Sequence, residues 1–238
     1  MLTIKKRVDN KVILKRTISL SFLSLFFVGL AYFLFSPVMI TAISSTGTAT
    51  PTLTVSKEVN VSSPGTITMG PSIPGITGNT ASSLASGTAT FTVQANSVSG
   101  FTMTLAASQT NALASGSYVF SDYTPASAGV PDFAWQNPNA GSATFGFSFG
   151  ADTAAYANQK FRYATTTCNT GSLNSASNCF YGFTGTTPIT VIATTQQTTG
   201  LGSAETVKFW AEFYNPTLST SFPSGTYTAT ITATVASN

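Results

Sequence analysis

The residue types that carry most enzyme chemistry are scarce in this chain of 238 residues. It contains no histidine, which is the usual proton shuttle near neutral pH and the commonest metal ligand. Glycoside hydrolysis requires two carboxyl groups facing each other across a cleft, and calcium requires clustered oxygen ligands. Six carboxylates are scattered singly after the basic N-terminal segment: Glu58, Asp122, Asp132, Asp152, Glu205 and Glu212. We therefore expect no enzyme activity, no metal site and no cofactor.

Three chemical alternatives stay open from the sequence. Two of the six carboxylates could face each other in the fold. Asp122 and Asp132 lie in one loop-rich segment, which could hold calcium. A Lys–Asn isopeptide bond beside a buried acid would involve Lys57, Lys208 or Glu212, although no recognisable motif surrounds them.

Two cysteines, Cys168 and Cys179, enclose a polar loop of ten residues. In an exported chain, an even pair at short spacing most often forms a disulfide. A redox-active pair is the alternative, but it would favour CxxC spacing and a neighbouring base that lowers the thiol pKa. We predict a structural disulfide, which would contribute about 3 kcal/mol by closing so short a loop.

Aromatic residues concentrate in the irregular stretch Tyr118–Phe183. If the protein binds a glycan, we expect a ligand platform at Tyr123, Phe133 and Trp135, because aromatic faces can stack on a ligand. The alternative is that these rings cover a second small core.

The N-terminus has the pattern of an export signal. Six basic residues lie within the first 16 positions, and the eighteen residues Ile18–Phe35 that follow carry no charge. A basic flank before an apolar run, with small residues after it, is typical of a secretory signal. Ala42 and Ser44 offer a cleavage site before Ser45, but the run is also close to the length of a membrane span. We expect residues 1–44 to be a signal peptide or a membrane anchor, and either would export the rest.

Net charge excludes nucleic acid as a partner. The formal charge is +3, but the chain after Thr17 has four basic and six acidic residues, which gives −2. A nucleic-acid binder needs a basic patch on its folded surface, and four bases are too few. Only 7% of the chain is charged, against about 25% in a typical domain.

Residues after Ser45 alternate with a period of two. Apolar residues alternate with threonine over residues 88–95, 101–105 and 226–235, and phenylalanines recur at every second position of 145–149 and at 209 and 213. Such alternation predicts strands with one buried face. Further strands are expected at Leu53–Val61, Thr66–Met69, Ile189–Ala193 and Val207–Tyr214, and one helix at Asp152–Tyr163. The pattern favours one all-β domain over 45–238, a single antiparallel β-sandwich or jelly roll with a long, aromatic-rich, irregular insertion over about 109–187.

The hairpin SGTATFTVQANSVSGFTMTL and the C-terminal SGTYTATITATVAS resemble exported bacterial surface proteins with Thr-rich WxL-like or fimbrial-type β-sandwich domains. The resemblance covers Pro51–Asn238. The paired Trp-x-Leu motif of WxL domains is missing, since Trp135 precedes Gln-Asn and Trp210 precedes Ala-Glu. No site residue is carried over from these families.

We therefore expect a non-catalytic protein of the extracellular space or cell surface, structural or adhesive, such as a subunit of a coat, a fibre or a pilus-like appendage. The alternative is a monomeric surface module that binds glycans. The expected partners are other surface-protein copies or cell-surface glycans. A membrane would be contacted only through the N-terminal segment.

Overall fold

The structure, a computed structural model, describes residues 24–31, 50–80 and 82–238. It divides into two units, Met1–Leu53 and Thr54–Asn238. In the first unit, residues 24–31 form a short helix with exposed side chains. No helix among the described residues is both long enough and apolar enough to span a membrane. Most of the predicted signal or anchor at 1–44, including the cleavage site before Ser45, lies outside the described residues.

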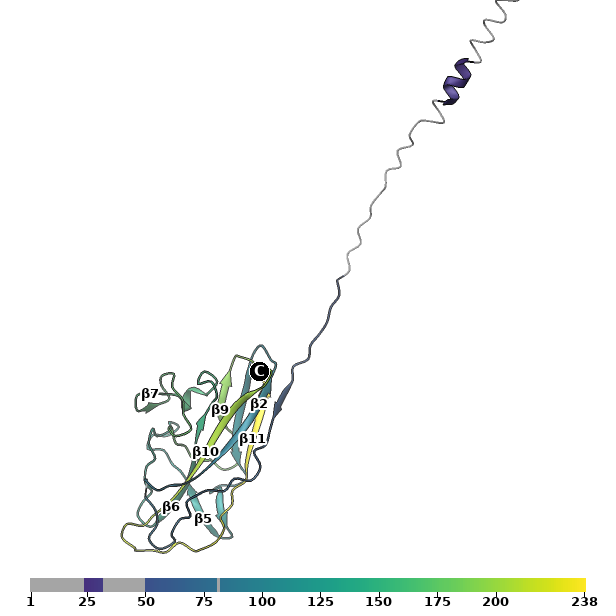
Figure 1. The fold of residues 1–238 in the computed structure, drawn as a ribbon. Helices are drawn as coiled ribbons and strands as arrows, with labels where there is room; N and C mark the ends of the chain where they lie inside the picture. The colour runs from purple at the N-terminus through teal and green to yellow at the C-terminus, as the bar shows by residue number, and fades with distance from the viewer. Residues whose placement is uncertain (1–23, 32–49, 81) are drawn as a thin grey trace, which may run out of the picture. The chain divides into compact units, whose positions relative to one another are not determined.

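The second unit is built on a mixed six-stranded sheet (Figure 1). Its spatial order is β1 (Val59–Val61), β2 (Ala85–Ala95), β10 (Ser203–Tyr214), β6 (Ser142–Gly150), β5 (Tyr118–Asp122) and β4 (Leu113–Ser115). Neighbouring strands are antiparallel except β5 and β6, which run parallel. The interval 109–187 thus supplies a central strand of this sheet, β6, as well as long loops.

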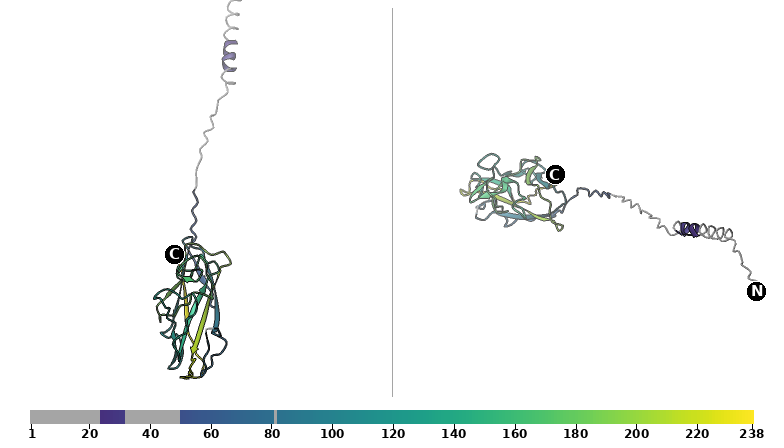
Figure 2. Two further views of the ribbon diagram at one scale, coloured as in Figure 1. Left: turned by 90° about the vertical axis from the view of Figure 1, so that its left-hand side faces the viewer. Right: turned by 90° about the horizontal axis from the view of Figure 1, so that it is seen from above.

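A second sheet has three antiparallel strands in the order β11 (Ile231–Ser237), β3 (Phe101–Ala107) and β9 (Ile189–Thr194). Two very short strands, β7 (Tyr163–Ala164) and β8 (Thr167–Cys168), form a separate hairpin after the 3-10 turn η1 (Gln159–Phe161). Several of the long strands run roughly along the long axis of the unit (Figure 2). The predicted β-rich class is confirmed.

Both larger sheets contribute to one hydrophobic core. The predicted alternation places Phe101, Met103 and Leu105 of β3 inside with no exposed surface. The phenylalanine rows of β6 and β10 also point into this core, with ring centroids of Phe145 and Phe209 6.0 Å apart. Aromatic rings supply large apolar areas, so the burial of these rows stabilises the domain.

Three predicted elements differ from the structure. Only the last three residues of Leu53–Val61 form a strand. The predicted strand Thr66–Met69 is wrong, because these residues form no strand. They pack closely against Gly87 of β2, where an added Cβ would lie 2.8 Å from a methyl carbon of Ile67. The predicted helix Asp152–Tyr163 is also wrong, because only Gln159–Phe161 is helical, as one 3-10 turn. Other backbone groups of this stretch form hydrogen bonds that an α-helix would not make. Arg162 donates to two carbonyls of that stretch, and the Asn158 N–H donates to Val191.

The C-terminal strand keeps the predicted alternation but is shorter. Only Ile231 onward is a regular strand, although Thr228 already bridges to Ala114 of β4. Along β11 the threonines are exposed, whereas Ile231, Ala233 and Val235 are half-buried. The incomplete burial follows from the position of β11 at the edge of its sheet, with a strand on one side only.

Candidate functional site

An apolar groove opens beside β11. Its walls are residues 63–73 on one side and 222–231 on the other, and its volume is about 810 Å³, within the usual range of ligand sites. The floor consists of core side chains from β2, β4, β5, β6 and β10: Ala85, Ala89, Phe91, Leu113, Phe120, Phe145, Phe209 and Ala211. We call this feature the β11 groove.

The apolar side chains along both walls of the β11 groove are only partly covered. Ile67, Met69 and Ile73 of one wall are half-buried, and so are Tyr227 and Ile231 of the other. The apolar side chains of β2 and β3 that face the core are buried instead. The apolar side chains of residues 63–73 and 222–231 therefore remain partly exposed where these two segments approach each other.

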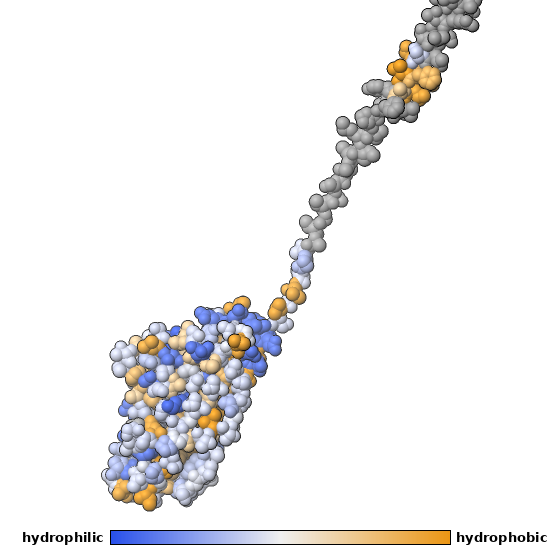
Figure 3. All heavy atoms as spheres, viewed as in Figure 1, coloured by the Kyte–Doolittle hydropathy of each residue, from blue (hydrophilic) through white to orange (hydrophobic). Residues whose placement is uncertain are grey.

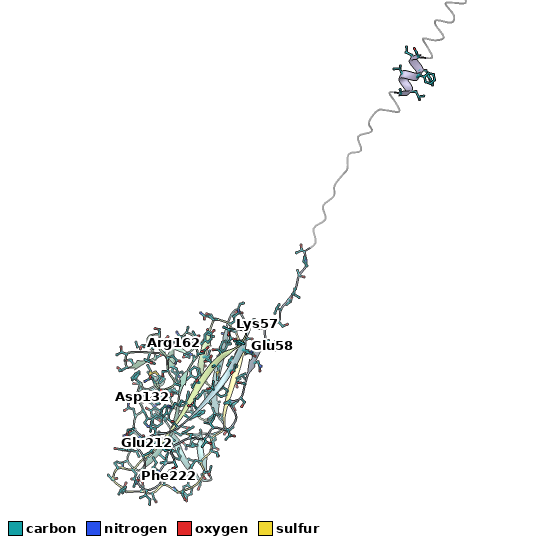
Figure 4. The ribbon with its side chains drawn as sticks, viewed as in Figure 1. Lys57, Glu58, Asp132, Arg162, Glu212 and Phe222 are labelled. Carbon is teal, nitrogen blue, oxygen red and sulfur yellow. A yellow bond between two sulfur atoms is a disulfide. The ribbon has the colours of Figure 1, made fainter. Side chains whose placement is uncertain are left out.

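An aromatic cluster forms one part of the groove. Phe222 lies 4.9 Å from Phe120 and 5.3 Å from Tyr227, measured between ring centroids. The Tyr227 hydroxyl donates to the carbonyl of Pro223, which fixes the ring at the wall. Figure 4 shows Phe222 near one end of this unit, with Lys57 and Glu58 toward the opposite end.

Glu205 is a carboxylate inside the core. It has no exposed surface, and the Ser203 hydroxyl donates to Oε1 at 2.7 Å, while Oε2 has no hydrogen-bond partner. Burial raises the pKa of Glu205 to about 7, and the hydrogen bond from Ser203 opposes that rise only in part. The side chain belongs to the inward-facing row of β10, in which Ser203 is the other polar residue and Val207, Phe209, Ala211 and Phe213 are apolar.

Glu212 is buried on the opposite face of β10. Trp135 Nε1 donates to Oε2 at 2.7 Å, and Oε1 has no partner. Burial raises the pKa of this carboxyl, and the hydrogen bond from Trp135 lowers it less. Because an ionised carboxylate without full hydrogen bonding is costly inside a protein, the loop that carries Trp135 supports Glu212.

The structure places the residues of the predicted aromatic platform as follows. Tyr123 and Trp135 are buried, with ring centroids 4.5 Å apart, in a small cluster with Phe180. Phe133 is partly exposed and its ring contacts Tyr163. This matches the second small core that the sequence left as the alternative, and a ligand could stack on Tyr123 or Trp135 only if those rings were uncovered.

The predicted disulfide is confirmed. Cys168 and Cys179 are bonded, with Cα atoms 5.7 Å apart. The bond joins β8 to the segment whose Tyr181 bridges to Phe147 of β6, so it ties the irregular loops to the main sheet. A structural disulfide indicates an oxidising environment outside the cytoplasm.

Asp122 and Asp132 support local structure. Asp122 accepts from the backbone N–H groups of Asn111 and Ala112, and Asp132 accepts from the Tyr123 hydroxyl at 2.6 Å. Among the described residues, no group of three or more acidic, cysteine or histidine side chains could hold a metal ion. The Lys208 ammonium lies 3.9 Å from the centre of the Trp210 ring.

A second, smaller hollow of about 400 Å³ lies beside β1 and the C-terminal end of β2. Amide and hydroxyl side chains line it together with Glu58: Asn60, Gln94, Asn96, Gln197, Thr198 and Thr199. We call it the amide hollow. Several of its amides already bond to the backbone, as Gln94 does to Gly200 and Asn96 to Ser56.

Comparisons with known proteins find no similarity to argue from: no family model, no curated protein and no solved structure matches this chain. Function must therefore be argued from the geometry. The β11 groove was missed by sequence reasoning because its wall at 63–73 lacks a strand.

Proposed function

We propose that this chain is a non-catalytic, exported surface protein whose domain is a β-sandwich that associates with other copies as a structural or adhesive subunit. The observation that carries the proposal is the edge strand β11 beside an open apolar groove. An edge strand presents unpaired backbone N–H and C=O groups, which is the usual template for pairing with another chain.

Two further observations support assembly outside the cell. The Cys168–Cys179 disulfide suits an oxidising compartment. Natural edge strands are commonly protected by lysine or other charges, but β11 carries none, and its exposed positions are Thr232, Thr234 and Ala236. The space-filling view shows a surface largely of intermediate hydropathy, with hydrophilic residues in limited areas (Figure 3).

The test is the assembly state of the exported chain. Sedimentation velocity and electron microscopy over a series of rising protein concentrations should show oligomers or fibres that grow with concentration. A chain that stays monomeric throughout the series would refute the structural-subunit proposal.

A second candidate function, a monomeric glycan-binding module, has the amide hollow in its favour. Amide and carboxylate groups are suitable hydrogen-bond partners for sugar hydroxyls. Binding of the exported chain to a glycan array, lost on replacing Gln94 and Gln197 with Ala, would support this function over the first.

A further inference from the structure

We propose that the β11 groove binds an uncharged amphiphile, a molecule with one alkyl or acyl chain and a neutral polar head. The chain lies along the floor of the groove, and the head meets the exposed threonines of the two walls. This ligand-binding role goes beyond the proposed function. Only Ile231 of β11 lines the groove, so a bound ligand leaves the backbone edge of that strand open to another copy.

Small residues on the floor give the groove its depth. The first three inward-facing positions of β2 are Ala85, Gly87 and Ala89, and Ala211 of β10 lies opposite Ala85 in the register of the two strands. An alanine leaves space above the sheet that a larger side chain would fill. From Ala85 to Phe91, which also lines the groove, the strand extends about 20 Å. The floor is therefore long enough for an extended alkyl chain.

The lining selects an uncharged ligand. Each of the described residues that lines the groove is uncharged, so an ionised group that enters it loses hydration without gaining an ionic partner. The half-buried side chains of Ile67, Met69 and Ile231 gain cover from an alkyl chain. Exposed threonines alternate with these apolar residues, as Thr68 and Thr230 do, and their hydroxyls can bond to a neutral ester or hydroxyl head.

The backbone of both walls is already paired within the domain. Gly70 of one wall uses its N–H and its C=O in hydrogen bonds with Ser86 of β2, and Thr228 of the other wall does the same with Ala114 of β4. Addition of a polypeptide strand depends on free backbone groups along an edge. An alkyl chain needs no hydrogen bonds, and therefore suits these walls better than a peptide does.

The first test measures the affinity of the full chain for decanol, by displacement of the fluorescent dye N-phenylnaphthylamine. Ala89→Leu should weaken decanol binding at least about tenfold, because the larger side chain occupies space on the floor that the alkyl chain needs. Thr88→Leu, the matched control, adds the same side chain on the exposed face of β2 and should keep the affinity of wild type. Equal affinity of wild type and Ala89→Leu would overturn the inference.

A second variant serves if Ala89→Leu disturbs the fold. Ala229→Asp adds a carboxylate to the lining without removing a large side chain, and should also weaken decanol binding at least about tenfold. Thr232→Asp adds the same charge at an exposed position of β11 and should retain binding. Unchanged affinity of Ala229→Asp would overturn the inference.

Probes with one chain length and different heads test the charge of the ligand. Decanoate and decylamine are charged at pH 8, and should bind wild type at least about tenfold more weakly than decanol. Equal binding of all three would overturn the assignment of an uncharged ligand.

A photoreactive probe locates the site. Decanol that carries a diazirine in its chain should form adducts on irradiation, which mass spectrometry should map to residues 63–73 and 222–231, and excess decanol should suppress them. Adducts confined to the apolar stretch Ile18–Phe35 would overturn the inference, because the ligand would then bind that stretch instead.

Sedimentation velocity separates this inference from the proposed function. Saturating decanol should leave the association of the chain unchanged, because the ligand does not cover the backbone edge of β11. Dissociation of oligomers by decanol, together with loss of assembly in Ala89→Leu, would show that a second copy fills the groove and would overturn the inference. A chain that stays monomeric and binds decanol as expected would support the inference and refute only the proposed function.

Discussion

Replacing Glu205 with Gln should stabilise the domain at alkaline pH and remove part of its pH dependence. Glu205 is fully buried with one unpaired oxygen. Its folded-state pKa is raised from 4.5 to about 7, chiefly by burial. Below pH 4.5 the carboxyl is protonated in both folded and unfolded chains. Between these two values the folded chain binds the extra proton, so stability falls as pH rises, and above pH 7 the loss is complete.

The size of the effect follows from the two pKa values. A difference from 4.5 to about 7 corresponds to about 3 kcal/mol of unfolding free energy at pH 8. Glutamine resembles the protonated acid, since it is neutral and can still accept the hydrogen bond from Ser203. In a domain of this size, about 3 kcal/mol corresponds to a rise of about 6–12 °C in melting temperature.

The assay is urea unfolding of wild type and Glu205→Gln at pH 4.5 and pH 8. The variant should exceed wild type by about 3 kcal/mol at pH 8, and by much less at pH 4.5. Glu58→Gln, which alters an exposed carboxylate, is the matched control and should shift neither value by more than about 0.5 kcal/mol. An equal difference between Glu205→Gln and wild type at both pH values would refute the reasoning, because the effect would then not arise from ionisation.

Three other changes test the remaining supports of the fold. Replacing both Cys168 and Cys179 with Ala should cost about 2–5 kcal/mol in urea unfolding, and an alkylating probe should leave both unlabelled in the native, non-reduced chain. Met103→Ala should cost about 2–5 kcal/mol, because Met103 has no exposed surface; a cost below about 1 kcal/mol would contradict its place in the core. Trp135→Phe should cost about 1–3 kcal/mol at pH 8 and less at pH 5, because Glu212 would lose its donor and its pKa would rise further.

The elements that the sequence predicted well are those whose apolar residues recur at every second position. Strands β2, β3, β6 and β10 each place alternate side chains in the core, so the alternation of apolar and polar residues was enough to predict these strands. The disulfide was predictable because only two cysteines exist and they lie close in sequence.

The features that were not predicted depend on which segments meet in space. The β11 groove forms where residues 63–73 and 222–231 approach without pairing, and neither stretch forms a complete strand. The parallel pairing of β5 with β6 leaves no periodic signal either. Glu205 was recognised only as a scattered acid, and Glu212 as that or as a possible member of an isopeptide bond. The burial of Glu212 could not be predicted, because the face of β10 that carries it is covered by a distant loop.

The position of the two ends of this domain has a consequence for protein engineering. The chain enters at Lys57, which binds the carbonyl of Asn238, so a fusion to the C-terminus would emerge beside the point of entry. The turn between β4 and β5 lies near Gly225, close to the Phe222 end. Gly116 in that turn has a φ of +61°, and a Cβ added to it would have no heavy atom within 4 Å. A peptide epitope inserted between Gly116 and Ser117 would therefore be displayed at the end of the domain opposite Lys57, where an antibody could reach it without contacting Lys57 or Asn238.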